Sequence, residues 1–142
     1  MTARFVDNYL GYLLGQANHA LFKDFEQVVK AAGLSSLEWR VLATLQDSPP
    51  LPVSQLAREV LSQQPTLTKQ VQRMSAKGWV TLTACADDQR RTLVRITATG
   101  RGVVLPLLAQ ARTHEHQQWL ARGAEDLQLL KQLLQKMAAP NA

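Results

Sequence analysis

Apolar residues recur at steps of three and four over residues 5–31, a spacing that predicts one amphipathic helix. The apolar stripe is broad, which indicates that the helix is covered on more than one side. Gly33 stands where a C-terminal stop is expected. The stripe consists of Val6, Leu10, Leu13, Ala17, Leu21, Phe25 and Val28, widened by Phe5, Tyr9, Leu14, Ala20 and Val29.

Shorter elements are predicted after this helix. Ser35 and Glu38 have the spacing of a capping box, so we expect a second helix to begin there. The proline-rich stretch 49–52 breaks that helix, and its own conformation is left unassigned. Ser54 is the predicted N-cap of a third, short helix.

A fourth helix is predicted between Pro65, which suits a first helical turn, and Gly78, which ends it. Its two sides differ in chemistry. The predicted inward positions are Leu67, Val71 and Met74, and the polar positions are Thr66, Lys69, Gln70 and Arg73.

Residues 79–84 and 92–97 favour β-strands, and the polar turn between them predicts a hairpin. Thr97 is the predicted cap of a fifth helix that reaches about residue 120. Pro106 lies inside this helix and predicts a kink or a local break. Gly123 separates a last helix, whose apolar face includes Leu133.

Length and composition narrow the class of protein. A chain of 142 residues fits one domain, and no apolar run approaches the ~20 residues of a membrane-spanning helix. The N-terminus lacks the layout of a signal peptide, so we expect a cytoplasmic protein without membrane association. The single cysteine, Cys85, excludes an intrachain disulfide. We find no catalytic spacing, phosphate-binding glycine loop or metal-ligand cluster, and therefore expect no enzyme, cofactor or bound metal.

Positive charge is concentrated in the middle of the chain. The net charge is +5, and residues 58–101 hold eight basic side chains against three acidic ones. Such a basic segment inside a near-neutral frame is typical of a module that binds a polyanion. A solvated basic face is the alternative explanation of the charge alone.

Three short helices followed by a hairpin is the order of a winged helix-turn-helix. A helix fits the major groove of B-DNA, and the fourth helix offers donors on its polar side. Arg90, at the hairpin tip, suits the negative potential of a narrow minor groove. Asp88, two residues earlier, is placed to pair with Arg90 and fix its direction.

A family resemblance supports this interpretation. The segment 88–100 (DQRRTLVRITATG) resembles the wing signature of the MarR family of bacterial transcription regulators, D-x-R followed by L/I-T-x-x-G. Residues 33–45 are similar to the family's second helix and residues 54–80 to its helix-turn-helix. The resemblance implies a mainly α fold with a small β-hairpin, in which a winged helix-turn-helix at about 34–100 lies between dimerisation helices at about 5–32 and 98–138.

The resemblance also implies roles for residues at matching positions. The recognition helix would span about Gln64 to Lys77, and Arg90 would enter the minor groove with Asp88 as its orienting partner. The full set of expected DNA contacts is Gln64, Thr66, Thr68, Lys69, Gln70, Arg73, Asp88, Arg90, Arg91 and Arg95.

A small aromatic or phenolic acid often tunes members of this family, and the resemblance leaves such an effector open here. The ligand residues would be Tyr12, His19, Trp39 and Arg40, because an apolar pocket with one positive charge suits an aromatic carboxylate. Trp39 as a core anchor is the competing interpretation.

We therefore expect a sequence-specific regulator of double-stranded DNA, in the first place a repressor, that binds a pseudo-palindromic operator as a homodimer. The alternative is a helical adaptor whose basic patch binds an acidic protein. An affinity for duplex DNA that depends on the sequence and falls steeply with salt concentration distinguishes the regulator from the adaptor.

Overall fold

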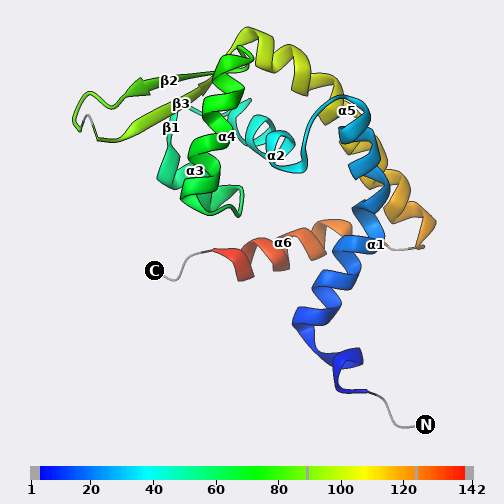
Figure 1. Cartoon of the computed structure of the whole chain (residues 1–142). Helices are drawn as coiled ribbons and strands as arrows, with labels where there is room; N and C mark the ends of the chain where they lie inside the picture. The colour runs from blue at the N-terminus through cyan, green and yellow to red at the C-terminus, as the bar shows by residue number, and fades with distance from the viewer. Residues whose placement is uncertain (1–3, 89, 124, 140–142) are drawn as a thin grey trace. The chain divides into compact units, whose positions relative to one another are not determined.

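The protein is described by a computed structural model that covers residues 4–88, 90–123 and 125–139 (Figure 1). The chain divides into two compact units. Asp24–Ala111 forms the winged unit, and Met1–Lys23 together with Arg112–Ala142 forms the helical unit. The elements are η1 (Phe5–Asn8), α1 (Leu10–Ala31), α2 (Ser36–Leu45), β1 (Leu51–Pro52), α3 (Val53–Glu59), α4 (Gln64–Ala76), β2 (Val80–Ala84), β3 (Thr92–Ile96), α5 (Ala98–Ala121) and α6 (Leu127–Ala138).

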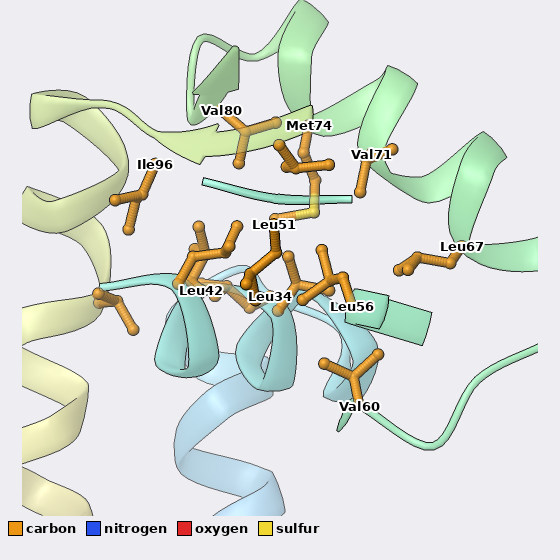
Figure 2. Close-up of a cluster of buried hydrophobic side chains, with 14 of the residues drawn as sticks. Leu34, Leu42, Leu51, Leu56, Val60, Leu67, Val71, Met74, Val80 and Ile96 are labelled. Carbon is orange, nitrogen blue, oxygen red and sulfur yellow. The ribbon is translucent and has the colours of Figure 1, made fainter. Parts of the chain in front are cut away.

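The winged unit is built around one hydrophobic core (Figure 2). Leu67, Val71 and Met74 of α4 are at most 1% exposed, which confirms their predicted inward positions. Their i, i+4, i+7 spacing puts all three on one side of α4, and this apolar side packs onto the core. Burial of this side fixes which side of α4 faces outward. The other fully buried large side chains include Leu42, Leu45, Leu56 and Leu107.

The sheet has three strands, where the sequence predicted a two-stranded hairpin. The strand order is β1-β3-β2, and both neighbouring pairs are antiparallel. The unpredicted strand comes from the proline-rich stretch, with Leu51 opposite Val94 and Pro52 opposite Leu93. Proline has no N–H to donate, so a two-residue edge strand is the place in a sheet that tolerates it.

The predicted N-cap is present at the start of α2 but not at the start of α3. The capping box of α2 is present in both directions, from Ser35 to Glu38 and back. The prediction that Ser54 caps α3 is wrong, because the N-cap is Pro52 and Ser54 lies in the first turn. The chain passes directly from β1 into α3, so the cap falls on the last strand residue.

The two long helices also differ from their predicted forms. The predicted helix 5–31 is interrupted at Tyr9, whose extended backbone separates the 3-10 turn η1 from α1. In α5 the helix continues through Pro106, so the predicted local break is wrong. The loss of one backbone hydrogen bond at a proline is tolerated inside a helix of 24 residues.

The helical unit exposes most of its apolar side chains. None of its described residues falls in the buried class. Phe5 is 76% exposed, Leu133 of α6 is 51% exposed and Leu120 of α5 is 61% exposed. Arg122 donates a hydrogen bond to the Ala20 carbonyl at 3.1 Å, which links α1 to the end of α5. No helix in the described part of the chain is long and apolar enough to cross a membrane.

Thr97 and Gly100 join the end of α4 to the start of α5 within the winged unit. The Thr97 hydroxyl donates to the Gly78 carbonyl at 2.6 Å and accepts from the Gly100 N–H at 3.0 Å. The Thr97 backbone N–H donates to the Trp79 carbonyl at 3.0 Å. A Cβ on Gly100 would lie 2.3 Å from that carbonyl oxygen. The T-x-x-G part of the wing signature is therefore a close backbone crossing that only glycine fits.

We expect Gly100→Ala to lower the free energy of unfolding by about 1–3 kcal/mol, because the added methyl group forces two backbone segments apart. Gly102→Ala is the matched control, since a Cβ there meets nothing within 4 Å. Alanine should stabilise α5 at that position by about 0.5–1 kcal/mol. Urea unfolding of both variants measures the difference, and equal stabilities would contradict this account of the junction.

Candidate nucleic-acid interface

The polar side of α4 carries most of the predicted DNA-contact residues. Thr66, Lys69 and Arg73 are exposed and lie three or four residues apart, as residues on one side of a helix do. Gln64 is also exposed, whereas Thr68 and Gln70 are half-buried. Because Leu67, Val71 and Met74 fix the opposite side in the core, this polar side is presented to the exterior.

Thr68 has part of its hydrogen-bonding capacity occupied within α4. Its hydroxyl donates to the Gln64 carbonyl one turn earlier at 2.9 Å. The hydroxyl proton is therefore committed, and Oγ1 keeps lone pairs that accept a hydrogen bond. Thr68 is suited to meet a donor, such as an exocyclic amino group, rather than an acceptor on a base edge.

Asp88 holds Arg90 at the wing through two hydrogen bonds, as the D-x-R spacing predicted. Its Oδ1 accepts from the Arg90 backbone N–H at 3.0 Å and from Arg90 Nε at 3.2 Å. The Arg90 side chain nevertheless remains 93% exposed. Since only Nε is used in this pair, the two Nη groups stay available for an external acceptor. Gln89, between the two residues, lies outside the described residues.

A groove of about 280 Å³ lies between the wing and α4. Its walls bring together four of the predicted contact residues, Gln64 and Thr68 from α4 with Arg90 and Arg91 from the wing side. The other six, Thr66, Lys69, Gln70, Arg73, Asp88 and Arg95, do not line it. Arg95 lies on β3, exposed and opposite Thr81 of β2.

The groove is also lined by polar residues that the sequence did not predict as DNA contacts. Ser54 and Gln72 line it beside Thr92. Ser54 reaches this position because α3 begins directly after β1, and β1 was not predicted. The i+4 relation of Gln72 to Thr68 was a usable signal for its place on the same side of α4.

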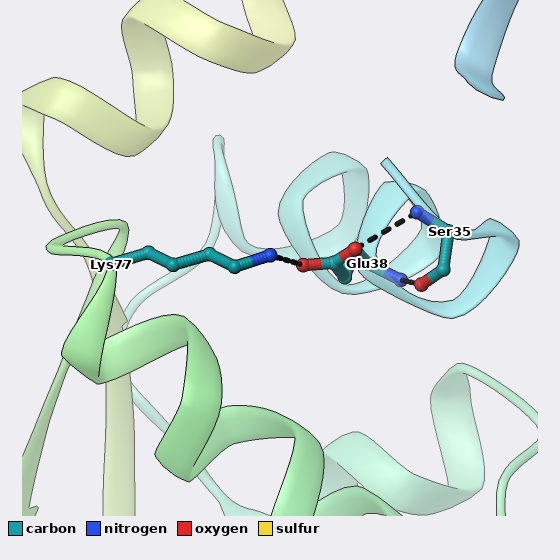
Figure 3. A network of polar contacts seen from close by, with 3 residues as sticks. All are labelled: Ser35, Glu38 and Lys77. Carbon is teal, nitrogen blue, oxygen red and sulfur yellow. Dashed lines mark hydrogen bonds and ion pairs between the residues drawn. The ribbon is translucent and has the colours of Figure 1, made fainter. Parts of the chain in front are cut away.

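Glu38 of α2 and Lys77, the C-cap of α4, form an ion pair (Figure 3). Lys77 Nζ donates to Glu38 Oε2 at 2.8 Å, and the Ser35 N–H donates to Oε1 at 2.8 Å. Burial raises the pKa of the Glu38 carboxyl, but the Lys77 hydrogen bond, the Ser35 N–H and the Lys77 charge together lower this pKa below its ordinary value. Glu38 is therefore a buried carboxylate that stays ionised.

The four predicted ligand residues fall in different units. Tyr12 and His19 belong to the helical unit, and Trp39 and Arg40 to the winged unit. Trp39 packs against the core and meets Phe25 edge-on, with ring centroids 5.4 Å apart. The Nε of Arg40 is buried and has no hydrogen-bond partner among the described residues. Within those residues no three His, Cys, Asp or Glu side chains gather as a metal site would require.

Comparison with known proteins decides the family. The sequence model of the MarR family matches residues 32–91. The crystal structure of a MarR family transcriptional regulator from Silicibacter pomeroyi DSS-3 is 34% identical, with a TM-score of 0.81 over 95% of this chain and 96% of that one. The chain belongs to the MarR family.

Two further relatives of this MarR-family chain are similar over most of their length. The homoprotocatechuate degradative operon repressor of Escherichia coli is 28% identical over 124 residues, 87% of this chain and 84% of its own. NadR, crystallised in complex with 4-hydroxyphenylacetate, is 25% identical, with a TM-score of 0.85 over 99% of this chain and 100% of that one. The predicted winged-helix fold is confirmed, and the MarR chain is a DNA-binding transcription regulator.

The lowered pKa of Glu38 predicts an acid-dependent stability. A carboxyl whose pKa is lower folded than unfolded stabilises the fold above the ordinary glutamate pKa, about 4.3. That contribution is lost as the pH falls through the lower, folded pKa. We expect Glu38→Gln to cost roughly 1–3 kcal/mol at neutral pH, and this difference from the wild type to shrink as the pH falls towards about 3.

Urea unfolding between pH 7 and 3 measures the difference. Glu26→Gln, at an exposed position of α1 in the same unit, is the control. A difference between Glu38→Gln and wild type that stays constant with pH would contradict the ion-pair assignment.

For the wing, we expect Arg90→Ala to weaken operator binding about 5- to 150-fold, equivalent to roughly 1–3 kcal/mol, with thermal unfolding unchanged. Asp88→Asn keeps the arginine but weakens its orientation, so its loss should be smaller. Fluorescence anisotropy at physiological salt measures both. Arg112→Ala, an exposed arginine of α5, is the control for loss of one positive charge. Equal affinities for Arg90→Ala and wild type would exclude the wing contact.

Proposed function

We propose that this MarR-family protein is a homodimeric, cytoplasmic repressor that recognises a pseudo-palindromic operator and acts without catalysis. The observation that carries the proposal is the groove between α4 and the wing. One rigid core presents the polar side of α4, and the Asp88–Arg90 pair presents a fixed guanidinium across the groove. A helix suited to the major groove and an arginine suited to the minor groove then address one duplex together.

Exposed basic and polar residues of α4 and the β2–β3 hairpin support sequence-specific DNA binding. Lys69, Arg73, Arg91 and Arg95 are exposed basic residues that supply salt-dependent attraction to phosphates. Thr66, Thr68, Gln64 and Gln70 supply neutral donors and acceptors for base edges. The ten residues predicted from the sequence are our proposed contact set.

The exposed apolar side chains of the helical unit support the homodimer. The N-terminal segment exposes Phe5 of η1, Tyr9 between η1 and α1, and Leu13 of α1, and α6 exposes Leu133 and Met137, each between 43% and 76%. An apolar surface of this kind is normally covered, and a second copy covers it through the same residues on both chains. Two recognition helices then address half-sites about 10 bp apart.

Relatives support control by an aromatic acid. NadR was crystallised with 4-hydroxyphenylacetate, and the Escherichia coli relative is named as a repressor of homoprotocatechuate degradation. In this chain the buried Arg40 Nε lacks a partner among the described residues, and Trp39 lies next to it in sequence. A carboxylate is the acceptor that such a guanidinium suits best. We propose Arg40 and Trp39, both in the winged unit, as effector-contact residues.

Selection of duplexes from a random pool tests the proposed function. We expect enrichment of an inverted repeat with half-site centres about 10 bp apart, and affinity that falls steeply with salt. Addition of 4-hydroxyphenylacetate during the selection tests release by an aromatic acid. Retention of an acidic protein partner with no enriched duplex would instead support the adaptor alternative.

A variant that disrupts the dimer tests whether operator binding requires the homodimer. Leu133→Glu buries a charge in the proposed dimer contact, so we expect a monomer by sedimentation and a loss of operator affinity of at least a hundredfold. Gln135→Glu adds the same charge to an exposed position two residues away, on the other side of α6. Wild-type protein that sediments as a monomer would contradict the homodimer.

A further inference from the structure

Glu38 uses its two carboxylate oxygens for two different elements. Oε1 closes the capping box of α2, the bond that the Ser35-to-Glu38 spacing requires. Oε2 reaches Lys77, which is 39 residues away in sequence and is the C-cap of α4. Glu38 is 5% exposed, and it is the only charged residue in the buried class among the described residues. A cap needs only one oxygen, so the second bond calls for its own explanation.

Lys77 is held from two sides by its neighbours. Its ammonium lies 2.8 Å from the Glu38 carboxylate and 4.6 Å from the centroid of the Trp79 ring. Both contacts favour one position of a flexible side chain. The next residue, Gly78, is fixed through the Thr97 hydroxyl. The last turn of α4 is thereby tied to the N-terminus of α2.

A helix fixed at one end amplifies small changes of direction at the other. α4 has 13 residues and is about 20 Å long, so a tilt of about 5° about Lys77 moves its N-terminus by about 2 Å. Gln64 and Thr66 lie at that N-terminus, at the greatest distance from the pivot. Hydrogen bonds to base edges tolerate only displacements much smaller than this one.

Resting on the proposed DNA-binding function, we infer that Glu38 and Lys77 are positioning residues that set the direction of the recognition helix. The pair does not touch DNA in this assignment. It selects the operator by holding Gln64, Thr66 and Lys69 in register with the bases. Loss of the pair costs specific affinity and leaves the phosphate attraction of the basic residues in place.

The experiment compares Glu38→Gln, Lys77→Met and the double variant on two duplexes. One duplex is the operator selected by the wild-type protein, and the other is a scrambled sequence of equal length. Kd is measured by anisotropy over a range of salt concentrations at a temperature where thermal unfolding shows each variant folded. Glu26→Gln and Lys30→Met, at exposed positions of α1, are the matched charge controls. Lys77→Arg keeps the positive charge and the donors.

We expect Glu38→Gln and Lys77→Met each to lower operator affinity about 5- to 30-fold. The double variant should lose no more than the single variant with the larger loss, because the two residues act as one unit. Glu38→Gln should keep the scrambled-duplex affinity and the wild-type salt slope, since it removes no charge that faces DNA. Lys77→Arg should stay within about threefold of wild type.

Two outcomes overturn the inference while the proposed function stands. Operator affinity within twofold of wild type in both single variants would mean that the pair only stabilises the fold. A loss confined to Lys77→Met, equal on both duplexes and with a reduced salt slope, would mean that Lys77 contacts a phosphate. Wild-type protein that prefers neither duplex would refute the proposed function itself, and the inference with it.

Discussion

The C-terminal end of α4, the proposed recognition helix, is the point on which the proposed DNA-binding surface depends. Two successive residues there are fixed by side chains from distant parts of the chain, Lys77 by Glu38 and Gly78 by Thr97. Thr97 also begins α5 through the Gly100 N–H. The close crossing of Gly100 and Trp79 leaves no room for a side chain. The end of α4, the base of the β2–β3 hairpin and the start of α5 therefore meet at one junction.

The hydrophobic core and the polar contacts at this junction position α4 in different ways. Burial of Leu67, Val71 and Met74 sets the rotation of the helix about its own axis, because a rotated helix would expose them. Hydrophobic contact is non-directional, so it does not by itself set the tilt. Hydrogen bonds and ion pairs are directional, and the polar contacts at Lys77 and Gly78 supply what the core lacks.

Local spacing made part of this structure predictable. The Ser35–Glu38 capping box, the inward side of α4 and the Asp88–Arg90 pair all involve residues within a few positions of one another. β1 was missed because its two residues pair with β3, more than forty positions later, and prolines disfavour strands. The Glu38–Lys77 pair was missed for the same reason. A capping motif locates the carboxylate, but only the tertiary fold shows where its second oxygen goes.

The helical unit has a consequence for how the protein responds to its own abundance. This unit exposes leucines and aromatic rings and buries none of them fully. These side chains are buried only when a second chain packs against them. Association is then a second-order process, and the concentration of the dimer rises with the square of the concentration of free subunit. The occupancy of a two-fold operator therefore rises more steeply than the concentration of the protein while the monomer predominates. Where most of the protein is monomeric, halving its concentration lowers the concentration of the dimer to about a quarter.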